Sequence, residues 1–458
     1  MIRLNGSGKS NGCIRWHLLL QIYIVLTIII TSSCTGQKQP YSILEFKGKG
    51  NVLNYSKDLM TVQFESDSLN PTAMVAGKGD LIMYGDNFYF CYSQTSGNKF
   101  LINTTKRLGY LNGKVQSITI PDNEDLIPWF QKSDTVDFSH LEFIIFNSRI
   151  MESYIPYLTH LAKIRPDIGI VFQEETNDMA RILTIFNPRI LLGGAVSVKM
   201  YNMLTRITNL ELLSVTLKDS LKNVPLPAMP ELEQLILSGT EHERLTGDDF
   251  LANNRQIERL SVTSVGTFDF SILKPLVNLK ELIINSCDTV VNFNLIKDHK
   301  MLEVLVPGWK GFTYNISKNE LPALRWITFS SEPTQDEFAS FIGSHPKLEV
   351  VEIMKNDKIN IFEPLLKLRK LHALTIVDTL TDFNTLKSFK NLDYLSLPKG
   401  VLDDSLKKTE LKLALPDATI VANEGVCLGS GWLLLIVPLV LLFRYAARKN
   451  PGRQRDRI

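Results

Sequence analysis

The chain has 458 residues, with 50 lysines and arginines against 48 aspartates and glutamates, and a formal net charge of +2. Hydrophobic residues make up 44% and charged residues 21%, values that exclude a mainly disordered chain and a collagen-like one. The length is enough for two or three globular units or for one long repeat array. Five cysteines are too few for a disulfide scaffold.

The N-terminus has the features of an export signal. Three basic residues precede a 13-residue run without charge at 18–30, a length suited to a signal peptide and short for a membrane span. Small residues then stand directly before Cys34, an arrangement that resembles a bacterial lipobox. The resemblance implies cleavage before Cys34 and lipidation of its thiol, with an ordinary signal peptide cut nearby as the alternative. We therefore assign 1–34 to a signal peptide.

Residues 35–125 carry no repeat and favour β-strands. The segments 88–92 and 115–120 are rich in aromatic and β-branched residues, which suit strands, and glycine-containing turns such as 77–80 separate such segments. A repeat array needs protection at its first edge. We therefore expect a small β-rich N-terminal cap over 35–125.

The middle of the chain repeats a short pattern. Nine segments begin with Leu or Ile and place a second aliphatic residue three positions later, at intervals of 21 to 25 residues. The leading residues are Leu210, Leu232, Ile257, Leu279, Leu302, Leu324, Leu348, Leu371 and Leu392. Looser copies at 141–146, 168–172 and 190–192, and a closing strand at 415–421, extend the array to 126–421, with the clearest repeats over 200–400.

This L-x-x-L-x-L pattern resembles the leucine-rich repeat family, and in particular bacterial membrane-anchored or lipoprotein members. The resemblance implies an α/β solenoid, with a curved parallel sheet on the concave face and short helices and turns on the convex face. The residues support it, because a short strand with one apolar face must stack on copies of itself to bury that face. We also expect a convex helix over 334–342, capped by Thr334 with Glu337 three residues later.

We expect the second, fourth and sixth residues after each leading residue to be exposed on the concave face. This face mixes apolar and small polar residues with few cations, which argues against nucleic acid and suits a protein, peptide or glycan partner. The alternative is that each aromatic residue covers its own repeat. The candidate partner-binding residues are Trp309, Trp326, Tyr394, Glu352 and Arg259.

Catalysis has no support in the sequence. Outside the predicted signal peptide no G-x-S-x-G elbow occurs, and none of the seven histidines forms a metal-spaced pair with another ligand. We therefore expect a protein that is not an enzyme and that uses no metal and no cofactor.

The C-terminus predicts a transmembrane helix at 425–443. These 19 residues carry no charge, and six lysines and arginines follow them. A helix of this length spans about 28 Å, close to the hydrocarbon thickness of a bilayer. The positive-inside rule then places the tail, 444–458, in the cytoplasm and the bulk of the chain outside, in the periplasm or at the cell surface. The segment also resembles bacterial sorting tails, which implies its removal as an alternative.

The charge distribution separates the two ends from the middle. Without the nine bases of the signal and tail and the single acid of the tail, 41 bases and 47 acids remain, a net charge of −6. We therefore expect a bacterial, membrane-anchored extracytoplasmic protein that binds a protein or peptide partner through its concave face. A structural envelope scaffold without a specific ligand is the alternative, and an enzyme in the cap or a eukaryotic receptor is less favoured.

Overall fold

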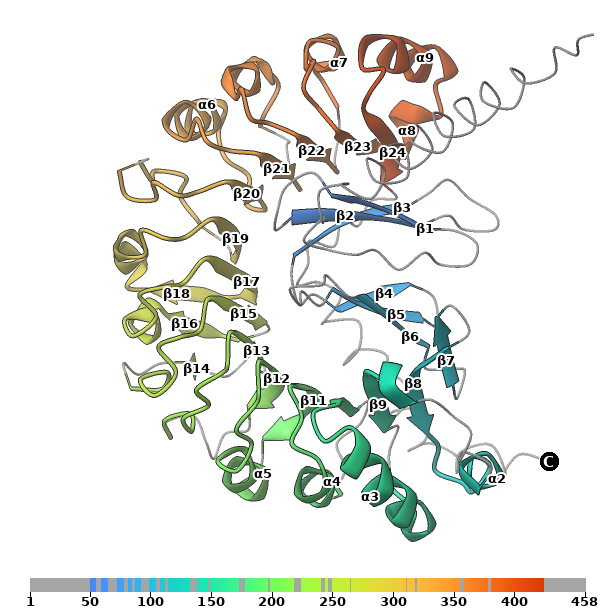
Figure 1. Cartoon of the computed structure of the whole chain (residues 1–458). Coiled ribbons are helices and arrows are strands. Elements are labelled where there is room, and N and C mark those ends of the chain that lie inside the picture. Colours follow the sequence, from blue (N-terminus) through green and yellow to red (C-terminus); the bar gives the residue numbers. More distant parts are fainter. Residues whose placement is uncertain are drawn as a thin grey trace, which may run out of the picture.

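The computed structural model describes the chain from residue 50 to residue 423, with gaps (Figure 1). The predicted signal peptide with Cys34, the predicted span at 425–443 and the tail at 444–458 lie outside the described residues. Among the described residues, no helix is both long and apolar enough to cross a membrane. The described ranges are 50–54, 59–64, 72–77, 81–84, 87–91, 99–103 and 108–423, the last interrupted at 112–113, 132–137, 147–148, 173–177, 197, 218–223, 240–243, 246–248, 264, 310, 318, 355–357 and 378–379.

A 15-stranded sheet forms the inner side of a wide arc (Figure 1). Neighbouring strands are parallel throughout, except that β7 pairs antiparallel with β8 at the first edge. The sheet thus begins with a hairpin and ends at β24. In spatial order the strands are β7 (Leu108–Leu111), β8 (Lys114–Ile120), β9 (Phe143–Phe146), β10 (Gly169–Phe172), β11 (Ile190–Val196), β12 (Leu212–Leu217), β13 (Gln234–Ser238), β15 (Arg259–Thr263), β17 (Glu281–Cys287), β19 (Val304–Trp309), β20 (Trp326–Phe329), β21 (Val350–Ile353), β22 (Ala373–Ile376), β23 (Tyr394–Pro398) and β24 (Thr419–Asn423).

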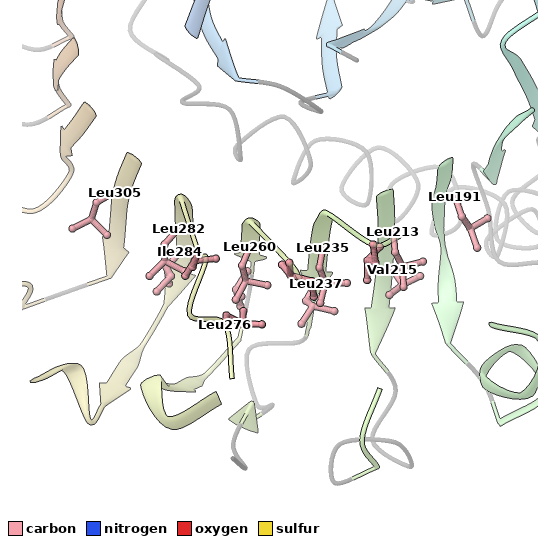
Figure 2. Packing of buried hydrophobic residues seen from close by; sticks show 14 of the residues in the cluster. Leu191, Leu213, Val215, Leu235, Leu237, Leu260, Leu276, Leu282, Ile284 and Leu305 are labelled. Atoms are coloured by element: carbon pink, nitrogen blue, oxygen red, sulfur yellow. The ribbon is translucent and has the colours of Figure 1, made fainter. Parts of the chain in front are cut away.

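The main core lies between this sheet and the outer arc. The leading residue of each repeat and the residues three and five positions later point into it, as Leu232, Leu235 and Leu237 do with exposures of 1% or less. Figure 2 shows such side chains from successive strands packed in a continuous line. Because every repeat contributes the same positions, the core is one cluster along the array. The predicted solenoid is therefore confirmed over the described residues of the 15-stranded sheet and its outer arc.

Helices and short turns form the outer arc. The α-helices are α2 (Ile127–Gln131), α3 (Ile155–Ile164), α4 (Met179–Ile185), α5 (Val198–Leu204), α6 (Gln335–Ser344), α7 (Phe383–Leu386), α8 (Lys399–Leu402) and α9 (Ser405–Ala414). The 3-10 turns are η2 (Phe138–His140), η3 (Glu152–Tyr154), η5 (Phe270–Leu273), η6 (Phe293–Asp298) and η7 (Glu363–Lys367), and a small parallel sheet joins β14 (Arg244–Leu245), β16 (Thr267–Asp269) and β18 (Thr289–Val291).

The predicted convex helix is confirmed as α6. Thr334 is its N-cap, with the hydroxyl accepting from the backbone N–H of Glu337, while the Glu337 carboxylate accepts from the backbone N–H of Thr334. This reciprocal pair satisfies two donors that a helix start leaves open.

One glycine fixes an irregularity early in the sheet. The register between β11 and β12 shifts between Leu192 and Ala195, and Gly193 lies there with a φ of +83°. A Cβ at this position would stand 2.0 Å from the backbone oxygen of Phe172. The bulge therefore requires glycine, because both the backbone conformation and the space exclude a side chain.

Two antiparallel three-stranded sheets lie inside the arc (Figure 1). The first joins β1 (Gly50–Asn54), β2 (Leu59–Phe64) and β3 (Thr72–Gly77), and the second joins β4 (Leu81–Tyr84), β5 (Asn87–Cys91) and β6 (Lys99–Asn103). β3 contacts β24 at one end of the main sheet, whereas β6 contacts β7 and β8 at the other end. β1–β6 therefore lie inside the arc, with contacts at both ends of the main sheet (Figure 1).

Candidate functional site

The inner face of the sheet is built from positions that alternate with the core leucines. Side chains two and four positions after each leading residue form two rows across the strands, and the hydrogen-bonded register places each row member beside the next. The first inner row is Leu212, Gln234, Arg259, Glu281, Val304, Trp326, Val350, Ala373 and Tyr394. The second inner row is Ser214, Ile236, Ser261, Ile283, Val306, Thr328, Glu352, Thr375 and Ser396.

The repeat period and the packing together decide the fold. In all nine repeats, the leading residue and the residues three and five positions later are buried between parallel strands and the outer arc. This is a leucine-rich-repeat fold. A parallel sheet of one strand per repeat, with aliphatic residues at these three positions, is what the L-x-x-L-x-L pattern predicts.

The comparisons with known proteins give distant structural likenesses only. No family model and no curated protein matches the chain. A leucine-rich-repeat protein of Leptospira interrogans is similar at 13% identity and a TM-score of 0.32, with 65% of this chain and 98% of that one covered. An internalin of Listeria monocytogenes is similar at 14% identity and a TM-score of 0.27, with 56% and 94% covered. A chain of the Toll–Spätzle complex of Drosophila gives 13% identity and a TM-score of 0.34, with 75% and 47% covered. The leucine-rich-repeat fold is therefore assigned from the repeats of this chain itself.

A polar group occupies the first inner row in the middle of the leucine-rich-repeat sheet. Arg259 donates from Nε to Oε2 of Glu281 at 2.6 Å and from Nη1 to Oε1 of Gln234 at 3.1 Å. All three side chains are buried. A guanidinium and a carboxylate are stable at such depth only as a hydrogen-bonded pair, and the pair fixes the lateral arrangement of β13, β15 and β17.

An apolar cluster continues the inner face toward the C-terminus. It is separate from the main core, because the sheet lies between the two clusters. Every member has an exposure of 5% or less, so this face of the sheet is covered. We call it the inner apolar cluster, and its members are Ile283, Val304, Val306, Trp326, Val350, Ala373 and Tyr394.

Glu352 lies beside this cluster with no exposed surface. Its Oε2 accepts from the Thr328 hydroxyl at 2.6 Å and from the Trp326 indole N–H at 3.2 Å. Burial raises the pKa of the Glu352 carboxyl to about 7, against the opposing effect of the two hydrogen bonds. The group therefore changes its charge near neutral pH, whereas an exposed glutamate is ionised there.

Several other inner-face polar atoms are buried without a hydrogen-bond partner in the described part of the chain. They are Oγ of Ser117 and of Ser261, Oγ1 of Thr263, both amide atoms of Asn285 and Oε1 of Glu352. A buried polar group without a partner costs about 1–3 kcal/mol. The covered inner face thus has unused hydrogen-bonding capacity, which a polar segment laid against it would satisfy.

The third inner position, six residues after the leading one, is accessible in several repeats, although Thr263 and Asn285 are buried there. Ser238, Ser330, Met354 and Val377 are half-buried there, at the carboxyl ends of the strands. Met354 and Val377 directly follow the neighbouring strands β21 and β22, and each is two residues beyond a buried member of the second inner row, Glu352 or Thr375. We call these four residues the inner rim.

The opposite border of the leucine-rich-repeat sheet carries ion pairs between successive repeats. Arg325 lies between Glu303 and Glu349, with a nitrogen–oxygen distance of 2.8 Å to each, and Lys280 pairs with Glu258 at 2.6 Å. Such partly exposed pairs contribute about 0–1 kcal/mol each. They hold the repeats in register and form no concentrated charge of one sign. Among the described residues, no group of three or more His, Cys, Asp or Glu could hold a metal ion.

The predicted location of Trp309 is wrong. The residue belongs to the main core, where its ring meets Phe312 edge-on with centroids 4.9 Å apart and Phe293 at 5.7 Å. Strand alternation explains the error: Trp309 is five residues after Val304, an inner-face residue, so it faces the opposite side of β19. Its aromatic neighbours make it a structural residue.

The other four predicted residues lie on the inner face but are not exposed there. Trp326 and Tyr394 are 1% exposed, Arg259 6% and Glu352 0%, so the expectation of exposure is wrong. On the inner side, the rows of neighbouring strands pack against one another, as in the inner apolar cluster, and β1–β6 lie inside the arc (Figure 1). The alternation places Gln234 and Glu281 on the concave face, but they were not among the candidate partner-binding residues, although their positions in the same row as Arg259 indicated that they contact it.

Proposed function

We propose that this chain is a membrane-anchored, extracytoplasmic leucine-rich-repeat protein that binds a protein or peptide partner through the inner side of its arc, and that it is not an enzyme. The inner apolar cluster carries the proposal. A solenoid buries its core on the other side of the sheet, so a second row of apolar and aromatic residues on the inner side is not needed for the stacking of repeats. Such a row suits contact with protein.

The chemistry of the inner face favours a partner with backbone and side-chain hydrogen-bonding groups. Unpartnered hydroxyl and amide groups stand beside the inner apolar cluster, and the guanidinium of Arg259 is held by Glu281. A nucleic acid would need a basic stripe, which this face lacks among the described residues. A peptide segment offers apolar side chains and amide groups together, and it matches both features.

Access to this face is through the inner rim. β1–β6 lie inside the arc (Figure 1), and Met354 and Val377 are half-buried while the two inner rows are buried, so we expect an external partner to meet these two residues first. The partner then either packs against the rim and the inner strands together, or takes the place of those strands. Both routes make Met354 and Val377 contact residues.

Affinity purification of the full chain from intact cells tests the binding proposal. We compare the wild type with Met354→Asp/Val377→Asp and with Ile361→Asp/Leu366→Asp, a matched pair of charges on exposed apolar positions elsewhere. The proposal predicts that a partner protein co-purifies with the wild type and with the Ile361/Leu366 variant. The amount recovered with the rim variant should be at least tenfold lower. Equal recovery with all three proteins would show that the inner side is not the binding surface and would favour a scaffold.

The anchoring proposal rests on the uncharged segment 425–443 with its basic flank and on the lipobox-like residues before Cys34. The intact mass of the protein extracted from membranes tests both. We expect a mass that includes residues after 425 and a lipid on Cys34. A mass that ends near 425 would establish a cleaved sorting tail, and a chain recovered without detergent would exclude anchoring.

A further inference from the structure

Two leucines on α9 are far more exposed than apolar residues usually are. Leu406 is 75% exposed and Leu413 is 78% exposed, the two highest values among the large hydrophobic residues that the structure describes. They are seven positions apart, so they lie about 20° apart around the helix axis and about 10 Å apart along it. Leu411, which is buried, faces roughly the opposite direction. The helix thus has an apolar ridge that points away from the protein.

Lysines stand on both flanks of this ridge. By helical geometry, Lys407 lies about 100° to one side of Leu406 and Lys412 about 120° to the other. Lys407 is 3.8 Å from Asp404, and its ammonium lies over the Phe383 ring. An apolar ridge between long cationic side chains is the arrangement of helices that lie in the interfacial region of a membrane.

The acidic residue on the ridge does not oppose this arrangement. Glu410 lies between the two leucines along the helix axis and about 40° to one side of Leu406 around it, and its carboxylate accepts from Nζ of Lys387 at 2.9 Å. The pair removes the net charge that a lone carboxylate would place on the ridge. The ridge of Leu406 and Leu413 therefore carries no net charge from Glu410, and Lys412 and the ion-paired Lys407 lie on its flanks.

The place of α9 in the chain brings it to the predicted membrane. β24 follows α9 directly and ends at Asn423, and the predicted span begins at Gly425. Two residues reach at most about 7 Å, so the end of β24 must lie close to the bilayer surface. α8 contacts both α9 and β24, which makes the three elements one packed unit at the end of the array.

We propose that α9 lies on the extracytoplasmic leaflet, with Leu406 and Leu413 inserted at the boundary between headgroups and acyl chains. This inference rests on the proposed anchor at 425–443. It adds an orientation: the last repeat rests against the lipid, and the arc stands away from the membrane with its inner rim open to the extracytoplasmic space. The lysines face anionic phospholipid headgroups.

Photocrosslinking of the full chain in lipid nanodiscs tests this contact. The nanodiscs contain phosphatidylethanolamine and phosphatidylglycerol, and benzoylphenylalanine replaces Leu406 or Leu413 in separate preparations. The matched controls replace Val277, which is 64% exposed, or Ile361, which is 50% exposed, on other repeats. Because all four sites are exposed, none of the replacements disturbs the core. Lipid adducts are counted by mass spectrometry.

We expect at least ten times more lipid adduct at positions 406 and 413 than at positions 277 and 361. Incorporation of the chain with equal adduct at all four positions would overturn the proposed contact and leave the anchor intact. Crosslinks from position 406 to a second copy of the chain in place of lipid would also overturn it. Failure of the chain to enter nanodiscs would refute the anchor, and with it the orientation.

Discussion

Glu352→Gln is the most informative single substitution, because the ionisation of Glu352 reports whether the inner face is covered. The carboxyl has no exposed surface, and burial raises its pKa from an ordinary 4.5 to about 7. A folded-state pKa above the unfolded value means that the folded chain holds its proton longer. The stability from this group is complete below pH 4.5 and is lost as pH rises toward 7. Between pH 4.5 and pH 7, the contribution of Glu352 to the free energy of unfolding falls by about 3 kcal/mol.

The assay is urea unfolding of the full chain at pH 5 and at pH 8.5, followed by tryptophan fluorescence. Gln has the shape of the protonated glutamate and keeps the acceptor for Thr328 and Trp326, but it does not titrate. We expect the free energy of unfolding of the wild type to fall by about 2–3 kcal/mol more between these pH values than that of the variant. Comparing the two proteins cancels the titration of every other group.

An identical pH dependence for wild type and Glu352→Gln would refute the reasoning. It would mean that Glu352 keeps an ordinary pKa, which requires contact with water. The inner face would then be open to water in solution.

Three further outcomes follow from buried groups and from one strained glycine. Burial lowers the pKa of His299 and of His345, so the stability that depends on their neutral forms is present above about pH 6.5 and falls at lower pH. Replacement of both by Leu should therefore reduce the change in the free energy of unfolding between pH 5 and 7, measured by urea unfolding. Gly193→Ala should lower the free energy of unfolding by more than about 2 kcal/mol in the same urea assay, because φ is positive there and a backbone oxygen blocks the Cβ. As the control, Gly400→Ala should change it by less than about 1 kcal/mol, because a Cβ at Gly400 would meet no atom within 4 Å. Burial raises the pKa of the Cys287 thiol to about 12, so iodoacetamide should modify it only in unfolded protein, as peptide mass mapping will show.

The repeats could be predicted from the sequence because their physical basis is local and regular. An aliphatic residue at Leu232 and at Leu235, recurring every 21 to 25 residues, has one stable solution, in which the strands stack and the leucines share one core. The same holds for α6, since Thr334 and Glu337 have the spacing of a capping box.

The state of the inner face could not be predicted in the same way. Trp326 and Tyr394 occupy inner positions as the alternation predicts, but their burial depends on contacts distant in sequence, such as those within the inner apolar cluster, which the repeat pattern does not specify. Trp309 is a different case, because counting alternate positions from Val304 would have placed it in the core. Alternation determines which side of the sheet a residue faces, and only the tertiary structure determines what covers that side.

Site-specific crosslinking in intact cells tests the central claim, that the inner side of the arc binds a protein partner. Benzoylphenylalanine replaces Met354 on the inner rim or, as the control, Ile361, which is half exposed elsewhere on the surface. The account predicts a discrete protein adduct from position 354 and none from position 361. The same adducts from both positions, or none from position 354, would contradict it.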